Sequence, residues 1–272
     1  MLPPNFPPAN LELLPDLPFS AHGLRLDVLR PRERRAQPVP AILHFHGGAW
    51  IKYGKWPVAN VFLARAGFVT VSADYRLAPC REGPGEIFPA QLHDVKTAVR
   101  FLRAHAADLG LDPARIGAWG VSAGGHLAAL LGTVGGPEWE GVDGGWPGES
   151  SAVQAVASVS GPMDFFDPGM PFGPEPFELL GAPLPEREEL ARAASPITHV
   201  SSDAPPFLFV HGTEDEEVPV SQSRRMHAAL HRVGASSELV ELAGDHYIND
   251  SRQAEVEARL LAFFRRTLNF PA

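Results

Sequence analysis

The run GVSAG at residues 120–124 matches G-x-S-x-G, a spacing that suits a nucleophilic serine. A serine in a tight turn between a strand and a helix adopts a strained backbone that projects its hydroxyl outward. Glycines on either side let the strand and the helix approach without a clash between Cβ atoms. Residues 115–120 have the pattern of a strand, and a small-residue helix is expected directly after them. We therefore predict that Ser122 is a nucleophile.

A second group of small residues, HGGAW at residues 46–50, follows a strand of the buried type. Consecutive small residues let backbone N–H groups point into a cavity, where they can donate to the oxyanion of a tetrahedral intermediate. We predict that the N–H groups of Gly48, Ala49 and Ala123 form this oxyanion hole. Trp50 is expected to line the wall of a substrate pocket, and plain core packing is the alternative.

Eleven histidines compete for the role of general base. We predict His246, because it lies between the last expected strand and the last expected helix, and parallel sheets place their sites at the carboxyl ends of strands. A solvated loop histidine is the alternative. We expect His46 to fix the oxyanion loop, His126 to pack behind the serine, and His211 to shape the loop that follows its strand.

The triad acid is expected on the loop at residues 211–219, which holds four neighbouring carboxylates. Asp215 is favoured, because a short side chain emerging early in a tight turn suits a fixed hydrogen bond to an imidazole. Glu214 and Glu216 are the alternatives, and Asp245 beside the predicted base would project in a different direction. The chain order is then Ser, Asp, His, which is typical of an α/β-hydrolase.

The elements that must position these residues alternate along the chain. Strands are expected at residues 24–31, 39–48, 68–76, 115–120, 153–161, 205–212 and 236–244, and helices at 60–67, 89–109, 122–132, 226–234 and 253–268. This alternation predicts a single α/β domain over residues 1–272, with a mostly parallel central sheet covered by helices on both faces. The first strand alternates apolar and polar residues, as a half-exposed strand near a sheet edge would.

Residues 163–202 interrupt the alternation with many prolines and one short helical patch. A stretch of this length without strands is either a small lid over the site or an ordered excursion between two strands. We expect it to shape the space available to a substrate.

Composition excludes several classes of partner and site. The net charge is −9 with no long basic run, so neither nucleic acid nor an anionic membrane surface is an expected partner. The single cysteine, Cys80, excludes an internal disulfide and fits a reducing compartment. No run approaches the roughly 18 consecutive apolar residues of a membrane span. The first residues lack the pattern of a secretory signal, so we expect a cytoplasmic location.

Taken together, these motifs resemble the carboxylesterases related to hormone-sensitive lipase, over most of the chain. HGGAW resembles that family's HGGGW loop, with Ala49 in place of the third glycine. SADYRLAP, DPARIGAWGVSAGGHLAALLG and HGTEDEEVP are more similar to the bacterial branch that includes bifunctional feruloyl and acetylxylan esterases. The resemblance implies the same triad and oxyanion donors, and a scaffold ion pair between Arg76 and Asp94. LAGDHYIND around His246 departs from the family's Gly-His-Gly-Phe-like ending.

The function implied is the hydrolysis of small carboxylic esters, with short acyl, acetyl or aryl groups, through an acyl-enzyme and without a metal or cofactor. The expected partner is therefore a small-molecule ester. Two other functions remain open. The same triad would serve an arylformamidase or a small-amide or peptide hydrolase. The fold could also serve as a catalytically inactive protein that binds a small ligand.

Overall fold

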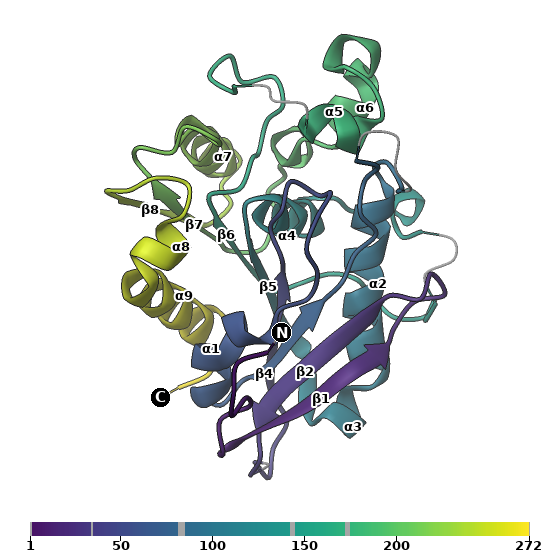
Figure 1. The fold of residues 1–272 in the computed structure, drawn as a ribbon, viewed down its shortest axis with the longest axis vertical. Coiled ribbons are helices and arrows are strands. Elements are labelled where there is room, and N and C mark those ends of the chain that lie inside the picture. Colours follow the sequence, from purple (N-terminus) through teal and green to yellow (C-terminus); the bar gives the residue numbers. More distant parts are fainter. Residues whose placement is uncertain (1, 34, 81–84, 142–144, 172–174, 272) are drawn as a thin grey trace.

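The computed structural model describes residues 2–33, 35–80, 85–141, 145–171 and 175–271 (Figure 1). These residues form an eight-stranded sheet in the order β1-β2-β4-β3-β5-β6-β7-β8. The strands are β1 (Leu11–Pro18), β2 (Arg25–Pro31), β3 (Val39–Phe45), β4 (Val69–Ala73), β5 (Leu111–Val121), β6 (Ala155–Val159), β7 (Phe207–Gly212) and β8 (Ser237–Leu242).

The strands β4, β3, β5, β6, β7 and β8 run parallel to one another, whereas β2 is antiparallel to both β1 and β4. The prediction of a mostly parallel sheet is therefore confirmed. Because parallel strands end at one edge of the sheet, the loops that follow β3, β5, β7 and β8 lie together there. These four loops carry every residue that the sequence predicts for catalysis.

Helices cover both faces of the sheet (Figure 1). The helices of four or more residues are α1 (Val61–Arg65), α2 (Ala90–Ala104), α3 (Ala106–Leu109), α4 (Ala123–Thr133), α5 (Glu175–Leu180), α6 (Glu188–Ala193), α7 (Ser221–Arg232), α8 (Ile248–Ser251) and α9 (Gln253–Thr267). Short 3-10 turns join them, among them η1 (Pro57–Asn60) before α1 and η4 (Pro196–His199) after α6. Within the described ranges, no helix is both long and apolar enough to cross a membrane.

The strand expected near a sheet edge at residues 24–31 is present as β2 (Arg25–Pro31), but the expectation that it is half-exposed is wrong. β2 lies between β1 and β4, and five of its seven residues are buried. Its polar side chains are buried with partners: Asp27 accepts a hydrogen bond from Lys55 Nζ at 2.7 Å, and Arg30 Nε donates to Glu12 at 2.9 Å. The alternation in the sequence therefore reflects buried ion pairs. The edge strand beside β2 is β1, in a proline-rich stretch that has no strand-like pattern.

The segment 163–202 carries α5, α6 and η4 and lies at the top of Figure 1. It is tied to α4, since the carbonyl of Ala194 accepts a hydrogen bond from the His126 ring at 2.7 Å. Phe165 is buried beside the same ring. Met170 and Pro171 line the cleft that contains Ser122. The segment therefore forms part of the wall of this cleft.

Candidate active site

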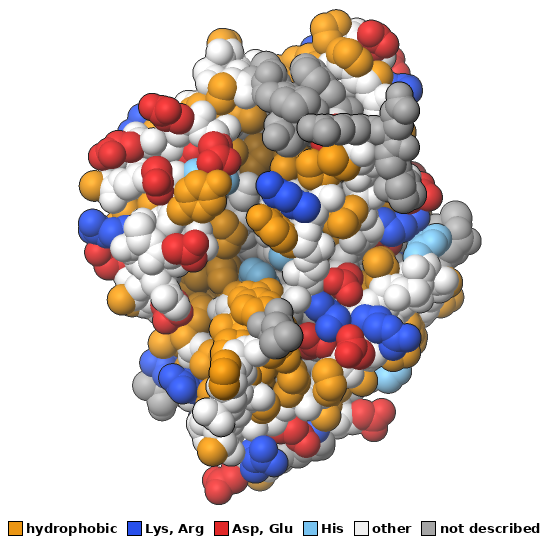
Figure 2. Space-filling view, in the orientation of Figure 1, with side chains coloured by type: hydrophobic (Ala, Val, Ile, Leu, Met, Phe, Trp, Pro, Cys, Tyr) orange, Lys and Arg blue, Asp and Glu red, His pale blue; other side chains and the backbone are white. Residues whose placement is uncertain are grey.

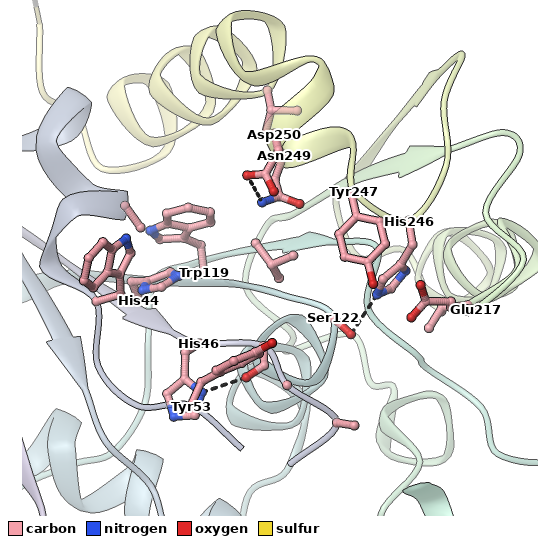
Figure 3. Close-up of a pocket in the computed structure, with 18 of the residues that line it drawn as sticks. His44, His46, Tyr53, Trp119, Ser122, Glu217, His246, Tyr247, Asn249 and Asp250 are labelled. Atoms are coloured by element: carbon pink, nitrogen blue, oxygen red, sulfur yellow. Dashed lines mark hydrogen bonds between the residues drawn. The ribbon is translucent and has the colours of Figure 1, made fainter. Parts of the chain in front are cut away.

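The three residues predicted as the triad lie in one hydrogen-bonded chain, and Figure 3 shows its contact between Ser122 and His246. Ser122 Oγ is 3.0 Å from His246 Nε2, and His246 Nδ1 is 2.8 Å from Asp215 Oδ2. Ser122 follows β5, Asp215 follows β7 and His246 follows β8, so the loops after three parallel strands supply the three groups. Because Nδ1 faces a carboxylate, the imidazole carries its proton there and presents the lone pair of Nε2 to the serine hydroxyl.

Asp215 differs from the competing carboxylates in the burial of its side chain. Its side chain is fully buried, whereas Glu214, Glu216 and Asp245 are exposed. Burial raises the pKa of a carboxyl group, but hydrogen bonds from His211, from His246 and from the Val218 N–H outweigh it and lower the pKa of Asp215 below its ordinary value. The carboxylate is therefore ionised and held in place on both oxygens.

His211 holds the loop that carries the acid, as the sequence predicts. The ring is fully buried, with Nε2 at 2.7 Å from the Val218 carbonyl and 3.2 Å from Asp215 Oδ2. Its Nδ1 lies 2.7 Å from Ser223 Oγ on α7. The ring thus joins the two ends of the loop and fixes it against a helix.

The backbone at Ser122 is strained as expected for a nucleophile in a tight turn. Its φ is +55° and its ψ is −120°, a conformation that costs a non-glycine residue about 1–3 kcal/mol. The flanking glycines are required: a Cβ at Gly124 would lie 2.0 Å from the Phe45 carbonyl oxygen, and one at Gly120 would lie 2.3 Å from the Gly124 backbone. The close approach of β3, β5 and α4 therefore sets the geometry of the serine.

The predicted oxyanion donors have no protein partner among the described residues, and Gly48 and Ala49 line the cleft. Within the described part of the chain, the backbone N–H groups of Gly48, Ala49 and Ala123 donate to no protein acceptor. Gly48 has a φ of +108°, and a Cβ there would meet the Lys52 carbonyl at 2.5 Å. Ala49 also has a positive φ, +51°, so its methyl group is accommodated in the left-handed region. Three N–H groups are thus available for an oxyanion.

Trp50 contacts the cleft, but its main contacts are internal. It is only 4% exposed, and its Nε1 donates a hydrogen bond to His126 Nδ1 at 3.1 Å. Burial lowers the pKa of His126 to about 4, so the ring is neutral and can accept at Nδ1 while Nε2–H donates to the Ala194 carbonyl. Trp50 therefore connects the oxyanion loop to α4 and to the segment 163–202.

Two further contacts hold the loops at this edge of the sheet. His46 stacks on Tyr75 with ring centroids 4.2 Å apart, and the Tyr75 hydroxyl donates to the His46 carbonyl at 3.0 Å. Arg76 Nε lies 2.9 Å from Asp94 Oδ2, and the Arg76 N–H donates to the same oxygen at 2.8 Å. The predicted scaffold ion pair is confirmed, and it fastens the loop after β4 to α2.

The cleft around Ser122 has a volume of about 1040 Å³ and opens on the face shown in Figure 2. Exposed Tyr53 and Tyr247 stand at its rim, and the deeper part extends along β3 and β5 to His44 and Trp119. The sequence motifs do not indicate His44 as a site residue. A signal was present, because His44 lies two residues before His46 on one strand and therefore on the same face of the sheet.

Residues 26–230 match the BD-FAE family. The chain belongs to the BD-FAE family. This BD-FAE chain is 35% identical over 262 residues to the esterase LipQ of Mycobacterium tuberculosis, an alignment that covers 91% of the chain and 59% of LipQ. It is also 35% identical over 221 residues to the esterase LipC of the same organism, covering 78% of the chain and 53% of LipC. The chain therefore spans between half and two thirds of the length of these curated relatives.

Solved structures resemble the BD-FAE chain over nearly its full length. A truncated carbohydrate esterase from gut microbiota superimposes with a TM-score of 0.83 at 28% identity, covering 95% of this chain and 96% of that one. The butyrate-bound esterase Est2 of Thermogutta terrifontis has a TM-score of 0.76 at 27% identity, covering 97% and 96% of the two chains. The expected α/β-hydrolase fold and the resemblance to esterases are both confirmed.

Proposed function

We propose that this chain hydrolyses small carboxylic esters through an acyl-enzyme on Ser122. The observation that carries the proposal is the continuous hydrogen-bonded chain from Ser122 Oγ through His246 to Asp215, with free N–H groups beside the serine. The Est2 esterase of Thermogutta terrifontis, which shares this fold, was solved with butyrate and with propionate bound. These acids support an ester with a short acyl group as the substrate.

In the proposed mechanism, His246 Nε2 takes the proton of Ser122 as its oxygen attacks the ester carbonyl. The N–H groups of Gly48, Ala49 and Ala123 donate to the oxyanion, and losing one such donor typically costs about 2.7–4 kcal/mol in the transition state. The imidazolium is stabilised by the ionised Asp215 and then gives its proton to the departing alcohol. Water activated by the same histidine attacks the acyl-enzyme and releases the acid.

A complete triad also distinguishes this proposal from a ligand-binding protein that has lost catalysis. Such a protein has no need for a strained serine at hydrogen-bonding distance from an imidazole that is itself oriented by a buried carboxylate. Amide hydrolysis would use the same groups, so relative rates on an acetyl ester and on formyl-kynurenine decide the preferred bond.

The test is the turnover of p-nitrophenyl acetate by the wild type and by Ser122→Ala. Removing the nucleophile of a triad lowers kcat by about 10⁶, and a loss of this size is expected here. Circular dichroism spectra of the two proteins provide the control for folding. Equal turnover by Ser122→Ala and the wild type would show that the serine is not the nucleophile.

A further inference from the structure

The deep end of the cleft has a chemical character of its own. Its walls are formed by Phe62 of α1 and by Val256 and Leu260 of α9, and its floor by Trp119 of β5 and His44 of β3. We call these five residues the His44 pocket. Hydrophobic side chains line the hollow in Figure 2, and histidine side chains are visible at its bottom. The pocket is therefore an apolar space with an imidazole in its floor.

The depth of the His44 pocket follows from the register of the sheet. His44 pairs with Trp119 across β3 and β5, and Trp119 lies three residues before Ser122 on β5. At about 3.3 Å per residue, the pocket floor lies about 10 Å along the strand from the serine. A substrate group has to be extended by this distance to reach it.

The contacts of His44 favour the tautomer that carries its N–H on Nε2. Ser72 Oγ accepts a hydrogen bond from the Trp56 N–H at 2.7 Å, so its own proton is free to point to His44 Nδ1, 3.4 Å away. With Nδ1 as the acceptor, the proton of the neutral ring sits on Nε2. Nε2 has no hydrogen-bond partner among the described residues. It is accessible to a ligand, because the ring lines the cleft.

His44 is neutral near neutral pH, because its pKa is well below its ordinary value. The side chain is 4% exposed, and burial together with the neighbouring His46 lowers the pKa of His44 to about 3. Asn60, which contacts Trp119 in the floor, is already paired: it accepts from Trp119 Nε1 at 3.0 Å and donates to the Val71 carbonyl at 3.1 Å. The floor thus offers one N–H donor in apolar surroundings.

The position of His246 assigns the His44 pocket to the acyl part of an ester. The leaving alcohol has to receive its proton from His246 Nε2, so it departs on the side of Ser122 where His246 lies. His44 and Trp119 lie on the other side of Ser122 in Figure 3. A chain attached to the carbonyl carbon therefore extends toward the pocket, while the alcohol extends toward Tyr247 and Glu217.

We propose that the His44 pocket binds acyl chains that carry an oxygen acceptor about six carbons from the scissile carbonyl, and that His44 Nε2–H donates to this oxygen. Of the 10 Å to the floor, a hydrogen bond takes about 3 Å. The remaining distance of about 7 Å corresponds to five or six C–C bonds, each advancing an extended chain by about 1.3 Å. The inference rests on the proposed ester hydrolysis and extends its substrates from short acyl groups to longer acyl chains that carry an oxygen.

The experiment compares kcat/KM for p-nitrophenyl 6-oxoheptanoate and p-nitrophenyl heptanoate. The two esters differ by one carbonyl oxygen, which an apolar pocket without a donor would reject. We expect the wild type to prefer the oxo ester by about fivefold, the size of effect expected of one neutral hydrogen bond. His44→Leu should reverse the preference, and His44→Gln, which retains a donor, should restore part of it.

His227→Leu is the matched control, because His227 is a partly buried histidine on α7, outside the cleft, that contacts Ser237. In His227→Leu, the ratio of kcat/KM for the 6-oxoheptanoate to kcat/KM for the heptanoate should equal the wild-type ratio. If His44→Leu does not fold, the ratio of kcat/KM for the two esters in the wild type still tests the proposal. A wild-type ratio of one or less overturns it. Absence of wild-type turnover on p-nitrophenyl acetate would instead contradict the proposed function, so the two failures are distinguishable.

Discussion

The contact between Trp50 and His126 leads to a quantitative prediction for Trp50→Phe. Phenylalanine keeps an aromatic ring beside Phe165 but removes the N–H that donates to His126 Nδ1 at 3.1 Å. His126 is fully buried, and its Nε2–H remains committed to the Ala194 carbonyl. The variant therefore leaves a buried acceptor without a donor.

The expected cost has two parts. An unsatisfied buried acceptor costs about 1–3 kcal/mol. The smaller ring also loses packing worth about 1 kcal/mol, close to the value of one buried methylene group. Trp50→Phe should therefore lower the free energy of unfolding by about 2–4 kcal/mol. We also expect kcat to fall, because Trp50 directly follows Ala49 and holds the predicted oxyanion donors in place.

Urea unfolding at pH 7, followed by far-UV circular dichroism, measures this cost. The variant His126→Leu and the double variant complete a double-mutant cycle, in which the two single changes should be non-additive by at least about 1 kcal/mol. A loss below about 0.5 kcal/mol for Trp50→Phe, or strict additivity in the cycle, would refute the claim that this hydrogen bond supports the oxyanion loop.

Two further predictions concern the acid and the buried histidines. Asp215→Asn should lower kcat by about 10⁴ through loss of the oriented tautomer of His246. The matched change Glu214→Gln, at an exposed side chain, should leave kcat within about twofold of the wild type. Equal losses of kcat in the two variants would mean that the acid is misassigned. Burial lowers the pKa of His126 to about 4 and that of His44 to about 3, so below about pH 6.5 the unfolded chain binds more protons than the native one. The free energy of unfolding should thus be highest above pH 6.5 and fall as the pH drops toward 4, by up to about 1.4 kcal/mol per pH unit for each ring. Urea midpoints at pH 7 and pH 5 measure this effect, and a constant midpoint would contradict it.

The elements around the site could be predicted from the sequence because the local backbone geometry there requires particular residue types. A Cβ at Gly120, Gly124 or Gly48 would meet backbone atoms at 2.5 Å or less, so the sequence must keep glycine at these points. The parallel strands 39–45 and 69–73 are buried throughout and are rich in apolar and β-branched residues. Patterns of this kind depend on residues that are close together in the chain, so they can be recognised in the sequence alone.

The parts that could not be predicted depend on contacts between distant residues. β1 forms only because β2 offers it a partner, and the polar residues of β2 are buried because Lys55 and Glu12 reach them. The choice of Asp215 among four carboxylates rests on which side chain the loop turns inward, and His211 and Ser223 determine that turn. The His44 pocket likewise arises only where β3, β5, α1 and α9 meet.

Covalent labelling with a fluorophosphonate tests the central claim most directly, because the reagent reacts with an activated serine. Esterase 2 of Thermogutta terrifontis, a structural relative, has been solved phosphonylated by sarin. Mass spectrometry of the digested protein should place one adduct on Ser122, and His246→Ala should abolish the labelling. A folded wild-type protein that carries no adduct, or carries it on a residue other than Ser122, would contradict the assignment of Ser122, His246 and Asp215 as a catalytic triad.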